Sequence, residues 1–227
     1  MSRIYTLTSF YPQTVRGGKE IGLLVLLLAA LVLVFTATSI TAATTSTSTA
    51  TTGQVKKKPI TGEEIERARN YFTDTEMTTQ AGQEVRFYSD MLDGHVVMIN
   101  TMYTNCKGAC PLITQKLLAV SRELGDLFGD RVHFVSVSND PERDTPEALS
   151  EFAGKQGADI AGWTFLTGDK ARVDGVLKKI GLYQPIFEQH KSTILIGNTR
   201  TGHWQKIRPD TPPQAIAVKL QELAAEG

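Results

Sequence analysis

The residues in this sequence best suited to chemistry are Cys106 and Cys110, the only two cysteines in 227 residues. They stand between a largely apolar run, 96–103, which predicts a buried strand, and a segment, 112–128, whose apolar residues recur at helical spacing. Pro111 suits the first turn of that helix, where a backbone N–H would have no partner. We therefore expect the pair at a strand-to-helix turn, with Cβ atoms about 6 Å apart on one face.

The chemistry of such a pair depends on the thiolate, which binds metals and attacks disulfides. The partial positive charge at a helix N-terminus favours that form. Two thiolates at this spacing can hold one metal ion, or they can close a disulfide after a small adjustment. A purely structural disulfide is disfavoured, because so short a loop gains little chain entropy from cross-linking. The placement therefore predicts redox or metal chemistry.

The pattern of residues 60–227 predicts one α/β domain. The segment 65–71 reads as a short helix or an extended lead-in, and Asp144 or Thr145 and then Thr211 are the expected helix caps. Strands are expected at 84–88, 96–103, 132–137, 164–166, 193–196 and 204–207, and further helices at 112–128, 145–156, 170–180 and 212–225. This order indicates a mixed sheet with helices on both faces.

The first sixty residues have a different composition. An apolar run begins at Ile21 and, with the uncharged residues that follow, supplies the roughly 20 residues that a membrane span needs. The basic flank before it predicts a cytoplasmic segment over 1–20, a transmembrane anchor over 21–43 and a flexible Thr/Ser/Ala-rich tether over 44–59. The alternative to the anchor is a cleaved signal peptide. Either interpretation places the domain in an oxidising compartment outside the cytoplasm, on the periplasmic side of a cell membrane.

The charge balance excludes one class of partner. Lys plus Arg and Asp plus Glu both total 24, so the formal net charge is zero. No basic stripe is interleaved with aromatic residues, so we expect no nucleic-acid partner.

Four features in this order carry a resemblance to a known family. Residues 106–111 have the form CxxxCP, residues 140–147 read DPERDTPE directly after a predicted strand, residues 163–168 read WTFLTG, and His190 stands just before a later strand. Together they resemble the Sco/SenC family over about 72–225. The resemblance implies a thioredoxin-like fold, copper as the bound metal and a role in cytochrome c oxidase assembly.

The same resemblance implies that Cys106, Cys110 and His190 are the copper ligands. Thiolates suit Cu(I), and imidazole suits copper in either oxidation state. Three such ligands leave an open side through which a partner's ligand can enter. The sequence departs from the family at Gln189, where an Asp is frequent, and in the short segment between Tyr183 and the histidine.

The function implied is a membrane-anchored copper chaperone that delivers copper to the copper-containing subunit of cytochrome c oxidase. The alternative is a thiol–disulfide oxidoreductase that reduces a copper-receiving partner, in which Cys106 attacks and Cys110 resolves the mixed disulfide. The three residues between the cysteines, and the lack of a proline between Pro185 and Pro209, favour the chaperone over this oxidoreductase.

Two further functions are alternatives to the chaperone. Tyr103 stands where peroxidases of this fold carry Thr, which disfavours a peroxidase. A membrane-bound copper or redox sensor is not separated from a chaperone by the sequence.

Other polar residues receive simpler interpretations. His95, His133 and His203 are expected to be structural or solvated. Helix capping is the expected role of 144–147, whereas Asp140 is a candidate neighbour of the metal.

Overall fold

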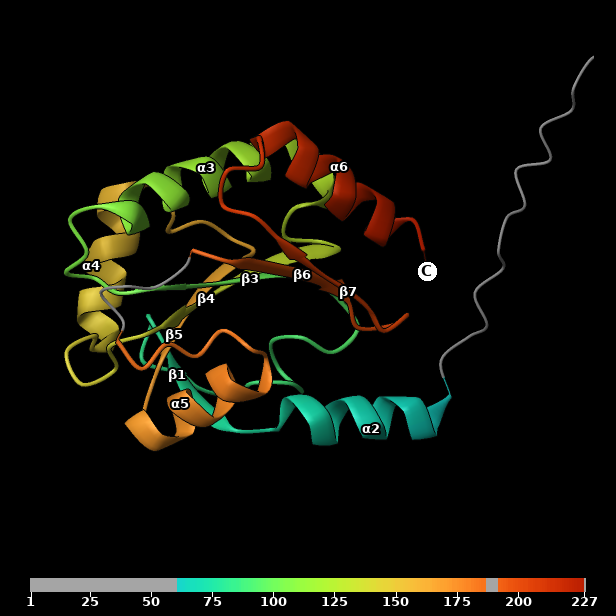
Figure 1. Ribbon diagram of the computed structural model, residues 1–227, viewed down its shortest axis with the longest axis horizontal. Helices are drawn as coiled ribbons and strands as arrows, with labels where there is room; N and C mark the ends of the chain where they lie inside the picture. The colour runs from blue at the N-terminus through green and yellow to red at the C-terminus, as the bar shows by residue number, and fades with distance from the viewer. Residues whose placement is uncertain (1–60, 187–191, 227) are drawn as a thin grey trace, which may run out of the picture. The chain divides into compact units, whose positions relative to one another are not determined.

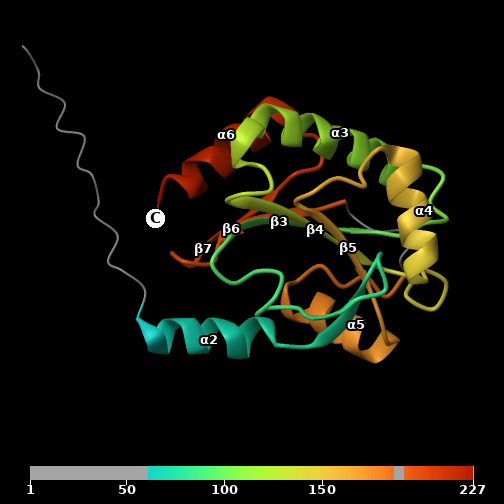
Figure 2. The same cartoon turned by 180° about the vertical axis from the view of Figure 1, so that it is seen from behind.

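The computed structural model describes residues 61–186 and 192–226. These residues form one sheet that lies between two layers of helices, as Figure 1 and the reverse view in Figure 2 show. The expected cytoplasmic segment, anchor and tether (1–20, 21–43 and 44–59) lie outside the described residues. Among the helices within those ranges, none combines the length and apolar character that crossing a membrane requires.

The sheet has seven strands in the order β2-β1-β5-β4-β3-β6-β7. The strands are β1 (Glu76–Thr79), β2 (Glu84–Arg86), β3 (Val96–Met102), β4 (Val132–Ser138), β5 (Trp163–Thr167), β6 (Ile194–Asn198) and β7 (His203–Ile207). The three middle strands β3, β4 and β5 run parallel, and the strands outside them pair antiparallel. The sheet is therefore mixed, as the sequence predicts.

The helices divide between the two faces of the sheet. They are α2 (Gly62–Phe72), α3 (Ala109–Leu124), α4 (Pro146–Gln156), α5 (Lys170–Lys179) and α6 (Pro213–Ala224), with a 3-10 turn η1 (Gly125–Leu127) after α3. Apolar residues of α3, α4 and α6 form one core with the sheet, and those of α2 and α5 form the other.

Strand β3 separates these two cores. All seven of its residues are buried, and its alternate side chains enter opposite clusters: Met98 lies in the first core, and Val97 and Ile99 lie in the second. This alternation follows from the two-residue period of a strand. The prediction of a central strand covered on both faces is confirmed, and it gives the residues after Met102 a rigid support.

Local details correct several sequence predictions. Asp144 and Thr145 are the alternative caps expected for α4, and Thr145 is the one found: its hydroxyl accepts a hydrogen bond from the Ala148 N–H. Thr211 is not the cap, because α6 starts at Pro213 and Pro212 therefore occupies the cap position; a proline suits the first helical position, where a backbone N–H has no partner. The helix expected to reach residue 128 ends at Leu124, because Gly125 takes a positive φ of 54°. Strand β1 was not expected, and 65–71 belongs to a helix rather than to an extended lead-in.

Candidate functional site

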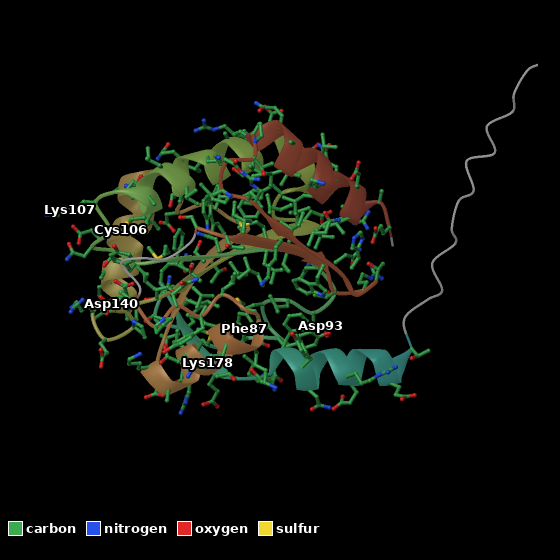
Figure 3. All side chains as sticks on the ribbon, viewed as in Figure 1. Phe87, Asp93, Cys106, Lys107, Asp140 and Lys178 are labelled. Carbon is green, nitrogen blue, oxygen red and sulfur yellow. The ribbon has the colours of Figure 1, made fainter. Side chains whose placement is uncertain are left out.

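The cysteine pair lies where β3 gives way to α3, at the position predicted; Figure 3 labels the first of the two, Cys106. Helix α3 starts at Ala109, so Cys110 lies in its first turn and Cys106 lies in the loop before it. The pair is reduced, with 8% of Cys106 and 3% of Cys110 exposed. The Cys110 backbone N–H donates to the Cys106 sulfur at 3.4 Å, which holds the first thiol against the helix start.

The pKa values of the two thiols are shifted in opposite directions. Burial opposes ionisation of Cys106, but hydrogen bonds from Cys110, the Gly108 amide and the Tyr103 hydroxyl outweigh it, and the pKa of Cys106 is lowered. Burial, assisted by the hydrogen bond to Cys106, raises the pKa of Cys110 to about 12. Cys106 is thus the thiol that ionises first, and Cys110 keeps its proton until a metal or a disulfide replaces it.

A buried carboxylate holds the loop that carries Cys106. Asp144 is 1% exposed and accepts from the Thr104 N–H at 3.0 Å, from the Thr104 hydroxyl at 2.6 Å and from the Ser138 hydroxyl at 2.6 Å. Burial raises the pKa of Asp144, although the hydrogen bonds from Ser138 and Thr104 oppose that shift. The expectation that Asp144 serves only to start α4 is wrong, since Thr145 supplies that cap.

Asp140, labelled in Figure 3, lies in the same loop after β4, and its contacts are to that loop and to the last residue of β4. Its carboxylate forms an ion pair with Arg143 at 2.8 Å, and its backbone N–H donates to the Ser138 hydroxyl at 2.9 Å. Its negative charge also contributes to the raised pKa of Asp144. The described contacts therefore link Asp140 to the cysteine loop through Ser138 and Asp144.

The histidines divide as follows. His95 and His133 pack against each other, with ring centroids 4.1 Å apart, beside the first residues of β3 and β4 and thus at the far end from the cysteines. His203 pairs with Glu226 at 2.7 Å. The proposed third ligand, His190, falls outside the described residues. Within residues 61–186 and 192–226, no group of three or more His, Cys, Asp or Glu is placed to hold a metal.

The sequence did not reveal how Thr104, Ser138 and Asp144 come together. The sequence did contain a signal for this cluster, because Thr104 and Ser138 stand at the ends of two strands that run parallel, and polar groups at that edge of a sheet often form sites.

The fold and this site define a class of protein. It is a thioredoxin-like α/β domain with a reduced cysteine pair, of unequal acidity, at the start of the helix that follows a central strand.

Comparison with known families identifies the particular group within that class. The family model for SCO1/SenC matches residues 64–225, and the chain belongs to this family.

Two curated relatives support this membership. The SCO1 protein homolog of Bacillus subtilis is 32% identical over 108 residues, which cover 47% of this chain and 54% of the relative. An SCO2-like protein of Rickettsia prowazekii is 32% identical over 103 residues, covering 42% and 46%. The chain thus spans about half the length of the curated relatives it matches.

Solved structures show the same architecture. Bradyrhizobium japonicum ScoI with copper bound is 25% identical, with a TM-score of 0.54 over 66% of this chain and 96% of that one. A SCO1/SenC family lipoprotein from Bacillus anthracis is 27% identical, with a TM-score of 0.57 over 66% of this chain and 92% of that one. The match covers nearly all of both solved chains, and the described residues of this chain all belong to one compact unit.

Proposed function

We propose that this protein is a copper chaperone that binds one copper ion through Cys106, Cys110 and His190. The observation that carries the proposal is the pair of reduced, nearly buried thiols, with the sulfur of Cys106 held by the Cys110 N–H. Two soft donors at one end of a central strand suit Cu(I). The copper-bound Bradyrhizobium japonicum relative supports the choice of metal.

The unequal acidities suit reversible capture of a metal. The lowered pKa of Cys106 makes it the easier thiol to ionise for the first bond to the metal, and Cys110 releases its proton only when the metal competes for its sulfur. Because that proton returns when the metal leaves, binding is weaker than it would be at two preformed thiolates. A site of this kind can retain copper and still pass it to a partner.

The partner and location belong to the same proposal. The recipient is the copper centre of a cytochrome c oxidase subunit, in keeping with the family to which the chain belongs. The domain acts on the outer face of a membrane, attached by the anchor at 21–43 and the tether at 44–59. The apolar run and the low-complexity segment after it support this arrangement.

Anaerobic titration of reduced 54–227 with Cu(I), against a competing chelator, tests the metal site. We expect one tight equivalent, and losses of at least about a hundredfold in affinity for Cys106→Ser, Cys110→Ser and His190→Ala. The matched control is His133→Ala, which removes a histidine at the far end of the sheet and should leave affinity unchanged. Unchanged affinity in His190→Ala would remove that residue from the site, and no tight binding by the wild type would reject the chaperone.

A second candidate function is reduction of a partner disulfide, favoured by the difference between the two thiols. The Cys106 thiolate would attack one partner sulfur, breaking the partner S–S bond and releasing a thiolate. Cys110 would then lose its proton and attack Cys106, which closes a Cys106–Cys110 disulfide and releases the partner fully reduced by two electrons. A Cys110→Ser variant should therefore accumulate the mixed disulfide, detectable by mass spectrometry. Failure to trap it would exclude this activity.

A further inference from the structure

A cavity of about 890 Å³ lies apart from the cysteine pair. Its walls come from α2, the end of α5 and strands β6 and β7. Figure 3 shows Lys178, on one of these walls, below the sheet, whereas Cys106 lies at the side of the sheet beside α3 and α4. The volume falls within the range of about 300–1,000 Å³ that is usual for small-molecule sites.

The apolar side of this cavity is formed by aromatic rings that pack against the sheet and against one another. The ring of Trp204 lies directly over Gly197, where an added Cβ would come within 2.2 Å of the ring. Phe72 packs against the same indole with ring centroids 4.6 Å apart. Tyr71, at 57% exposure, adds a second aromatic ring that faces solvent. These rings give the cavity an aromatic wall against which an apolar group can pack.

The charged side chains that line the cavity are all positive. Four cations line the cavity: Arg67, Lys178, Lys179 and Lys206. No acidic residue is among the lining residues, and no ion pair joins these cations to a carboxylate within the described part of the chain. Lys178 lies over the Tyr183 ring at 4.5 Å, and Lys206 donates to the Gly181 carbonyl at 3.3 Å, so neither contact neutralises its charge.

The dipole of helix α5 accounts for only two of the four cations that line the cavity. Lys178 and Lys179 lie in the last turn of α5, where a positive charge complements the helix dipole. Arg67 and Lys206 come from other elements, α2 and β7, and nothing in the α5 helix requires them. Convergence of cations from three elements beside an aromatic surface indicates a ligand that is both anionic and apolar.

We propose that this cavity binds a small amphipathic anion. Its planar apolar part stacks on Trp204 and Tyr71, and its acidic group is held by Lys179, Lys206 and Arg67. The proposal does not depend on the copper site, because the two sites share no lining residue.

Fluorescence titration of 54–227 with 8-anilinonaphthalene-1-sulfonate tests the proposal. This probe has the required planar body and a single negative charge. We expect one saturable site per chain, and binding of its uncharged analogue N-phenyl-1-naphthylamine at least about fivefold weaker, because the charge-assisted contacts are lost. The double variant Lys179→Ala/Lys206→Ala should weaken the sulfonate about tenfold and leave the uncharged analogue unaffected.

The matched control is Lys155→Ala. Lys155 also lies in the last turn of a helix, α4, but it pairs with Glu151 and lines none of this cavity. A second variant, Tyr71→Ser, removes an exposed ring and should weaken both probes several-fold without unfolding the domain. Equal affinity for the charged and uncharged probes, or no loss in the double lysine variant, would overturn the proposal. Displacement of the probe by poly-glutamate as effectively as by free sulfonate would also overturn it, since it would indicate a docking surface for an acidic protein.

Discussion

Asp144 and Thr104, forty residues apart in the chain, are joined by two hydrogen bonds in the folded domain. The carboxylate accepts from both the backbone N–H and the hydroxyl of Thr104, at 3.0 and 2.6 Å. These bonds attach the loop that carries Cys106 to the loop that follows β4. The geometry of the cysteine pair is thus fixed from outside its own strand-to-helix turn.

Removal of the Thr104 hydroxyl should loosen this attachment. Thr104→Val keeps the side-chain shape and the backbone bond but leaves a buried Asp144 oxygen without one donor, which should destabilise the reduced domain by about 1–3 kcal/mol. Thr104→Ser restores the donor and should recover most of that loss. Urea denaturation of both variants measures the difference. Equal destabilisation by Val and Ser would show that the methyl group, rather than the hydroxyl, contributes the stability.

Asp144 should make stability depend on pH. Because its pKa is raised by burial, the folded protein holds the carboxyl proton more tightly than the unfolded chain does. The stability that this group contributes is therefore complete below the unfolded pKa of about 3.9 and is lost as the pH rises through the folded value. Asp144→Asn removes this titration, so its unfolding free energy relative to wild type should increase between pH 4 and pH 7.

Urea denaturation at both pH values measures that change. Asp126→Asn, which alters an exposed carboxylate in η1, is the control and should show no comparable trend. A constant difference between Asp144→Asn and wild type across this range would contradict the raised pKa.

The two thiols should react with alkylating agents at very different rates. In Cys110→Ser, the serine hydroxyl, the backbone amides and the Tyr103 hydroxyl can still donate to Cys106, so its lowered pKa predicts alkylation by iodoacetamide at a lower pH than for an ordinary cysteine. In Cys106→Ser, burial keeps the pKa of Cys110 far above the usual value, so alkylation should be at least about a hundredfold slower at pH 8. The alkylation rates of the two variants, measured by mass spectrometry from pH 5 to 10, test this difference. Similar profiles would show that the environments of the two sulfurs do not differ as described.

The contact between Gly197 and Trp204 makes a prediction for stability. Gly197→Ala places a Cβ where the indole ring lies, and the displacement should destabilise the domain by about 1–3 kcal/mol. Gly154→Ala is the matched control, because its added Cβ meets nothing within 4 Å and the position is inside α4. That change should stabilise the domain by about 0.5–1 kcal/mol. Thermal or urea denaturation of the two variants side by side checks both signs.

The sequence predicted the parts of this molecule that depend on local pattern. The apolar run before Cys106, the helical spacing after it and the cap at Thr145 all involve near neighbours, and the structure confirms them. Strand β1 was missed because Met77 is its only large apolar residue, so the strand depends on pairing with β5 rather than on its own composition. The role of Asp144 was missed for a related reason, since its partners are set by the parallel pairing of β3 and β4.

The attachment of Thr104 to Asp144 also has a consequence for how the protein is made. As the chain emerges from the ribosome, both cysteines appear before the carboxylate that holds their loop, which follows Thr104 by forty residues. Until β4 has paired with β3 and the next loop has docked, the thiols belong to an unfinished chain and are open to oxidants and stray metals. During this interval the two cysteines lack the hydrogen bonds that fix the geometry of their loop in the folded domain.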